Sequence, residues 1–92
     1  MNLICKGITQ NKFSNIEAPY KSEISQYFTE HSTAVAYSSS TVIDVTNNCK
    51  TDIPNAMFTD GSFDWSSSMV YHFEKYNLKL NDDFIQHVLS KS

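Results

Sequence analysis

The sequence predicts an α+β fold, an antiparallel sheet of two hairpins covered on one face by about three helices. Three observations indicate it: apolar residues at helical spacing in three segments, short β-branched segments near the middle, and an Asp-Gly pair between aromatic segments. A chain of 92 residues buries roughly 64% of its surface on folding, enough for one thin core. We therefore expect a single domain, 1–92.

The N-terminal third is predicted to hold a strand and a helix. Residues 1–8 are short and apolar, which fits a possible edge strand of the sheet. Pro19 suits the first turn of a helix. The residues after it recur on one helical face, so we expect a helix over about 19–31; they are Tyr20, Ile24, Tyr27, Phe28 and His31.

The first predicted hairpin joins the β-branched segments 33–37 and 41–46 through the serines of 38–40. Strand alternation then points Ile43 inward and Asp44 outward. A polar loop follows at 47–52.

The second predicted hairpin closes on Asp60-Gly61, a favoured pair for a two-residue turn. Such a turn pairs Phe58 with Phe63 and gives the sheet one aromatic face. The other face carries Met57, Thr59, Ser62 and Asp64.

Two helices are predicted to complete the chain. Ser66 can cap the first, which should end near Asn77; its apolar side holds Met69, Val70 and Phe73. The second should start at Asn81. Three signals support this helix. Leu80 and Ile85 can form a hydrophobic staple, and the acids at 82 and 83 lie at the positive end of the helix dipole. Its apolar stripe consists of Phe84, Ile85, Val88 and Leu89.

Composition restricts the partners and the compartment. The formal net charge is −3, there is no arginine and the seven lysines are scattered, so direct nucleic-acid binding is disfavoured. No apolar run approaches the roughly 20 residues of a membrane span, and the first residues lack the basic start and the apolar run that a secretory signal is expected to have. We expect a cytoplasmic protein without membrane contact, in which Cys5 and Cys49 are reduced thiols.

No complete catalytic motif is present, so we do not expect an enzyme. The three histidines lack metal-ligand spacing, and the segment from Asp60 begins like a calcium loop but has Trp65 at position 6 and Tyr71 at position 12. We therefore expect no metal and no cofactor. A minor enzyme that uses Cys49 or a histidine stays open as an alternative.

Four aspartates have no role in capping a helix: Asp44, Asp52, Asp60 and Asp64. One interpretation is solubility and turn chemistry. The other is an acidic docking surface for a basic protein, with Tyr37 and Met57 as uncharged contacts, because acidic patches speed encounter with basic partners and mimic phosphate.

The segments 58–66, 71–76 and 80–87 together resemble a bacterial pattern written T-D-G-x-W-x-W-P, Y-x-x-x-Y and L-P-x-x-F. This chain has Phe63 for a Trp, and Ser66 and Asn81 for the two Pro. Proteins of this pattern are often encoded among toxin-immunity loci. In size and acidity the whole chain is similar to the immunity proteins of contact-dependent growth inhibition.

The resemblance implies an immunity protein that binds and neutralises a cognate toxin domain, which would be basic if it is an RNase or DNase. Carboxylates would then stand in for substrate phosphates. The alternative is a small acidic adaptor or phage-type inhibitor of a host protein. We expect a monomer or a weak homodimer.

Overall fold

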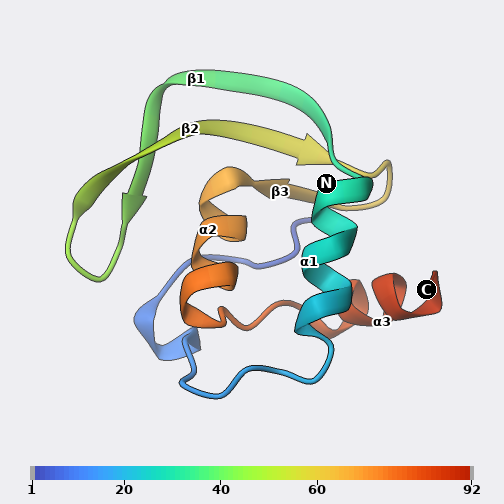
Figure 1. Ribbon diagram of the computed structural model, residues 1–92. Coiled ribbons are helices and arrows are strands. Elements are labelled where there is room, and N and C mark those ends of the chain that lie inside the picture. The colour runs from blue at the N-terminus through green and yellow to red at the C-terminus, as the bar shows by residue number, and fades with distance from the viewer. Residues whose placement is uncertain (1, 92) are drawn as a thin grey trace.

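The computed structural model describes residues 2–91 and confirms the α+β class. Figure 1 shows the strands on one side of the molecule and the helices packed below them. Along the described chain the elements are η1 (Gln10–Lys12), α1 (Lys21–Glu30), β1 (Thr33–Asp44), β2 (Cys49–Thr59), β3 (Asp64–Ser66), α2 (Ser67–Tyr76) and α3 (Asp82–Ser90). Among residues 2–91, no helix has the length and apolar character needed to cross a bilayer.

The three strands form one antiparallel sheet in the order β1-β2-β3. Helix α2 packs against all three strands, and α1 packs against α3. Between the sheet and the helices lies one hydrophobic core: Ile4, Cys5, Ile24, Tyr27, Phe28, Phe63, Trp65, Phe73, Leu78, Leu80, Phe84, Ile85 and Val88.

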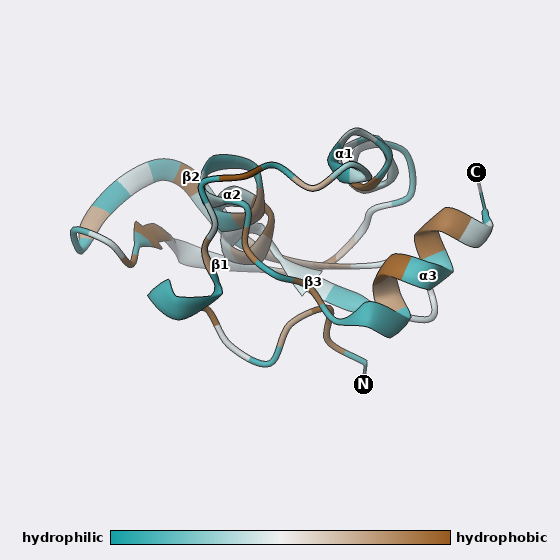
Figure 2. Ribbon diagram, turned by 90° about the horizontal axis from the view of Figure 1, so that it is seen from below, coloured by the Kyte–Doolittle hydropathy of each residue, from teal (hydrophilic) through white to brown (hydrophobic). Residues whose placement is uncertain are grey.

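The helix predictions are confirmed in their main features. Ser66 caps α2, because its side chain accepts a hydrogen bond from the Met69 amide, and Asn77 ends the helix in a left-handed conformation. Helix α3 buries Phe84, Ile85 and Val88. Figure 2 shows hydrophobic and hydrophilic residues alternating around α3, as the predicted amphipathic stripe requires.

The first predicted hairpin is wrong, because β1 continues through the three serines. Ser40 donates its amide to the Ser38 hydroxyl, and the Asn55 side chain donates to the Ser40 hydroxyl. These hydrogen bonds engage polar groups of the bulged serines, and the strand continues in the same direction. The reversal comes at residues 45–48, where Asn48 takes a positive φ of 57° and donates its amide to the Asp44 carbonyl.

The second hairpin exists, but its predicted register is wrong. Phe58 pairs with Trp65 and Thr59 with Asp64, so the loop has four residues, 60–63. The Asp60 carboxylate accepts the amides of Ser62 and Phe63, which holds the wider loop closed. Phe58 and Trp65 still share the inward face.

The N-terminal segment covers the edge of β3 with a single bridge between Leu3 and Asp64, in place of the predicted strand; Met1 lies outside the described residues. The Ile4 amide donates to the Asp64 carbonyl, and the Asn81 amide donates to the Ile4 carbonyl. Further along, the Ser14 amide donates to the Tyr76 carbonyl. Backbone hydrogen bonds therefore join residues 2–14 to β3 and to the connection between α2 and α3.

Candidate functional site

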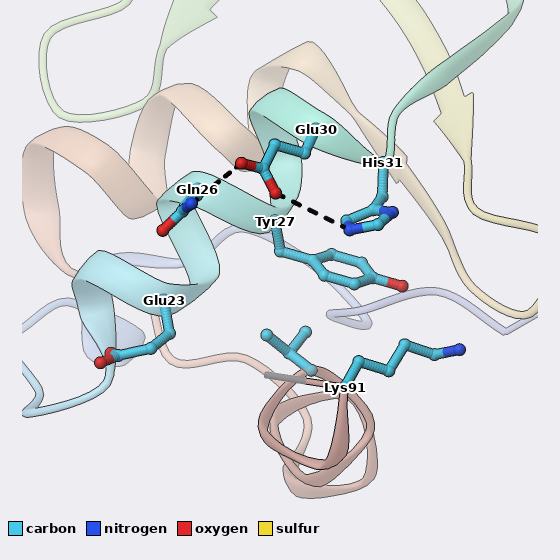
Figure 3. Close-up of a pocket in the computed structure, with 7 residues that line it drawn as sticks. Glu23, Gln26, Tyr27, Glu30, His31 and Lys91 are labelled. Atoms are coloured by element: carbon cyan, nitrogen blue, oxygen red, sulfur yellow. Dashed lines mark hydrogen bonds and ion pairs between the residues drawn. The ribbon is translucent and has the colours of Figure 1, made fainter.

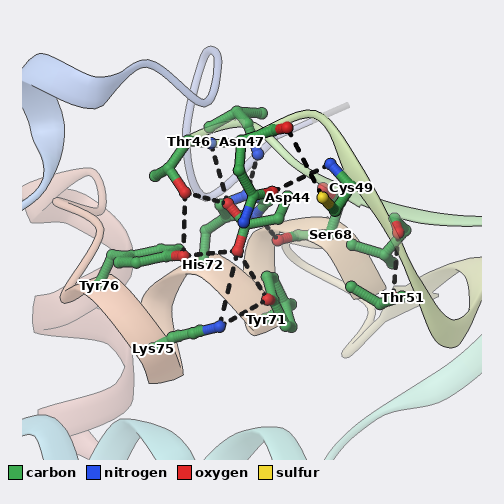
Figure 4. Close-up of polar contacts among 12 residues, drawn as sticks. Asp44, Thr46, Asn47, Cys49, Thr51, Ser68, Tyr71, His72, Lys75 and Tyr76 are labelled. Atoms are coloured by element: carbon green, nitrogen blue, oxygen red, sulfur yellow. Dashed lines mark hydrogen bonds and ion pairs between the residues drawn. The ribbon is translucent and has the colours of Figure 1, made fainter.

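Asp44 points inward, which corrects the predicted strand phase. Its side chain is 3% exposed, whereas Ile43 is 46% exposed. Figure 4 shows the carboxylate surrounded by hydroxyl groups that α2 and the turn present. The Tyr71 and Tyr76 hydroxyls donate to Oδ2 at 2.8 and 2.5 Å, and the Thr46 amide and hydroxyl donate to Oδ1 at 2.9 and 2.6 Å.

The surroundings of Asp44 keep its carboxylate ionised. Burial alone would raise the pKa, but the hydrogen bonds from Thr46, Tyr76 and Tyr71 outweigh it and hold the pKa of Asp44 well below its usual range. Lys75 lies 3.7 Å from Oδ2 and adds a compensating charge. This carboxylate therefore fastens the end of β1 to α2 and is not presented to a partner.

His72 reinforces the same junction and was not assigned a bonding role from the sequence. The side chain is fully buried. Its Nε2 accepts the Val45 amide at 3.1 Å, so Nδ1 carries the proton and donates to the Ser68 carbonyl at 2.7 Å. The imidazole is thus a neutral link between α2 and the β1–β2 turn, where neither ring nitrogen is left for catalysis.

Asp60 lies at the other end of the sheet, in the loop between β2 and β3. Its Oδ2 accepts the Tyr27 hydroxyl and lies 2.9 Å from His87 Nε2, while Oδ1 accepts the amides of Ser62 and Phe63 at 2.8 and 2.7 Å. Only 4% of the side chain is exposed. This group joins α1, α3 and the loop.

The pKa values of Asp60 and Tyr27 are consistent with a structural role for the Asp60 carboxylate. Burial opposes the charge on Asp60, but the hydrogen bonds from Tyr27, the loop amides and His87 outweigh it and lower the pKa of Asp60 to about 2. Burial and the neighbouring Asp60 charge raise the pKa of Tyr27. His87 directs Nε2 at the carboxylate, so that nitrogen is already engaged within the chain.

The four aspartates therefore do not form one face. Asp44 ends β1 beside the start of β2, whereas Asp60 directly follows the other end of β2, and both side chains are enclosed. Asp52 is exposed on β2, and Asp64 is half-buried on β3. Because Trp65 points inward, alternation places Asp64 on the outer face of the sheet together with Met57. Two of the four predicted contacts thus stay accessible.

Tyr37 and Met57 do come together. Both line a hollow of about 350 Å³ at the β1–β2 pair, and Tyr37 is 76% exposed. The register shift between Ala34 and Ala36 makes Val35 an additional residue, so that Val35 and Ala36 lie opposite Met57. We call Val35, Ala36, Tyr37 and Met57, with the adjoining edge of β1, the β1 surface.

Two further hollows lie beside α1. One, about 170 Å³ in volume, is shown in Figure 3: His31 lies 4.0 Å from Glu30, which also accepts from Gln26. It is smaller than the roughly 300 Å³ at which ligand pockets begin. The other, about 420 Å³, runs between α1 and α2 over apolar side chains. Two of the hydroxyl groups that line it, those of Ser32 and Ser67, already form hydrogen bonds within the chain.

The described residues show no group of three or more histidine, cysteine, aspartate or glutamate side chains arranged to hold a metal ion. Cys5 is a buried free thiol and Cys49 an exposed one. Comparison with family models, curated proteins and solved structures finds no match to this chain.

Proposed function

We propose that this chain is an immunity protein, which binds the toxin domain of a contact-dependent growth inhibition system in the cytosol of the producing cell and blocks its active site. It acts by binding and not by catalysis. The β1 surface is the observation that carries the proposal. The resemblance of residues 58–87 to proteins of toxin-immunity loci supports the choice of partner.

The β1 surface has the composition of a protein contact. Tyrosine is enriched among residues that dominate binding energy, and Tyr37 stands exposed beside a hollow. Val35 adds a second apolar side chain that is 60% exposed. Covering both removes apolar surface from water at about 25 cal/mol per Å². The contact is therefore expected to centre on apolar side chains.

Charge has a smaller role than the sequence suggested. Asp44 and Asp60 are engaged within the chain, so they cannot replace substrate phosphates. Asp64 lies on the same sheet face as Met57, and Asp52 is an exposed residue of β2, the strand that also carries Met57. Such rim carboxylates speed the encounter with a basic toxin and make it dependent on salt.

The proposal predicts that a toxin domain is encoded beside this chain, and the test uses that domain. The wild-type chain should bind it and rescue growth when the two are co-expressed. Tyr37→Ala should raise the dissociation constant at least about tenfold, because it removes an aromatic anchor. Ile16→Ala is the matched control, since Ile16 is equally exposed at 80% but distant in sequence from the β1 surface.

Absence of binding and rescue by the wild-type chain would refute the immunity function and favour the adaptor or host-protein inhibitor. Rescue that Tyr37→Ala and Ile16→Ala leave equally intact would refute the β1 surface as the contact. Asp52→Lys with Asp64→Lys should mainly slow association, with a smaller salt dependence than the wild type.

A further inference from the structure

The edge of β1 carries backbone groups that no other strand covers within residues 2–91. Strand β1 pairs with β2 alone, whereas the opposite edge of the sheet, at β3, is covered by the N-terminal segment. We infer that a second copy of the chain covers this edge when no other partner is bound. The two β1 strands would pair antiparallel across a two-fold axis.

Exposure along β1 is the first observation that supports a covering partner. The eight residues 33–40 are all exposed, so neither face of this segment is buried by the helices. A strand in an antiparallel sheet ordinarily buries one face. Here the side chains of Val35 and Tyr37 are exposed, and no second strand pairs with β1 on its outer edge within residues 2–91. An edge of this kind is a template for pairing with another chain.

The charge distribution is compatible with a partner identical to the chain itself. Residues 33–43 contain no charged side chain, so antiparallel self-pairing opposes no like charges. The nearest carboxylate, Asp44, is enclosed and has Lys75 at 3.7 Å. Lysine and proline are among the residues that protect an edge strand against self-association. Neither residue occurs in the segment 33–43.

The β1 surface brings exposed apolar side chains and a hollow together in one patch. Val35 and Tyr37 are exposed, and Tyr37 lines the hollow with Ala36 and Met57. In a dimer with a two-fold axis, each copy would contribute this same patch. Both halves of the contact therefore come from one patch, as an isologous interface requires.

The bulges of β1 set the strength of this pairing. Register shifts at Val35 and at the serines 38–40 interrupt the ladder and bend the edge. Only short regular stretches remain for a second strand. We expect a weak, reversible dimer with a dissociation constant on the order of 10–100 μM, weak enough for a tighter partner to displace.

Analytical ultracentrifugation of the chain alone tests the inference, from about 10 μM to about 1 mM. The wild type should pass from monomer to dimer over this range. Val35→Lys should raise the dimer dissociation constant at least about tenfold, because it places a cation at the pairing edge. Val35→Ile should keep the dimer. Ile16→Lys, the same change at another exposed apolar position, should leave it unchanged.

A wild-type chain that stays monomeric up to about 1 mM overturns the inference. So does a dimer that survives Val35→Lys, or one that Ile16→Lys weakens equally. Far-ultraviolet circular dichroism of each variant verifies the fold. The inference concerns the surface on which the proposed function rests, yet the measurement needs no toxin. A dimer without toxin binding would refute the immunity function alone, and toxin binding by a strict monomer would refute the dimer alone.

Discussion

Substitution of Asp60 tests whether the carboxylate in the β2–β3 loop is a structural group. Asp60→Ala removes an acceptor for the Tyr27 hydroxyl, for His87 and for two loop amides. Asp60→Asn keeps the oxygen that accepts the two amides and removes the charge. The pair of variants therefore separates the closure of the loop from its attachment to α1 and α3.

The magnitude follows from the hydrogen bonds. Bonds to a charged group contribute about 1.5–3 kcal/mol each, and they are not additive where they share one acceptor. Removing one member of a buried charged group costs about 3–5 kcal/mol, because its partners stay buried without it. We expect Asp60→Ala to lower the free energy of unfolding by about 3–5 kcal/mol. Asp60→Asn should lower it by about 1–2 kcal/mol.

The pH dependence has a definite sign. The pKa of Asp60 in the folded chain, about 2, lies below its ordinary value of 3.8. The ionised carboxylate therefore stabilises the fold above pH 3.8, and this contribution is lost as the pH falls from about 4 to about 2. Asp60→Asn lacks the contribution, so its deficit relative to the wild type should shrink over that interval.

Urea unfolding at a series of pH values measures both effects. The exposed Asp52→Asn is the control and should change the free energy of unfolding by less than about 0.5 kcal/mol. The reasoning is refuted if Asp60→Ala costs no more than this control. It is also refuted if the deficit of Asp60→Asn is the same at pH 2 as at neutral pH.

Three further perturbations follow from the structure. Asp44→Asn leaves two tyrosine hydroxyls without a charged acceptor and should lower the Tm by about 10 °C; an unchanged Tm would contradict the inward placement of Asp44. Gly61→Ala should cost about 1 kcal/mol in urea unfolding because Gly61 has a φ of 97°, whereas Gly7→Ala, with no such φ, is the control. Iodoacetamide should alkylate Cys49 in the native protein and Cys5 only on unfolding, which mass spectrometry distinguishes; equal rates would contradict the burial of Cys5.

The helices could be predicted from the sequence because their signals are local. Apolar residues three and four positions apart identified the buried faces of α1 and α3. Ser66 and Asn77 marked the ends of α2 through their own side-chain and backbone preferences. Each of these features depends on residues within one turn of the helix.

The strand phase failed where the deciding contacts are distant in sequence. Alternation treats a carboxylate as an outward residue, yet Asp44 finds its donors on Tyr71 and Tyr76, 27 and 32 residues further along the chain. The two-residue turn failed because Asp60 bonds the loop amides and Tyr27 at once. The predicted acidic face required Asp44 on the outer face of its strand and Asp60 accessible in the turn, but both side chains are enclosed.

The hydrogen bonds of residues 2–14 give the molecule an order of assembly. Residues 2–14 are synthesised before the groups that bind them, which lie at Asp64 and around residues 76–81. In the growing chain, the N-terminal segment therefore cannot form these hydrogen bonds until the later residues have been synthesised. Until residues 64–81 have emerged, the segment that covers the edge of β3 lacks these hydrogen bonds. We expect the nascent chain to be most vulnerable to proteases and to aggregation in this interval.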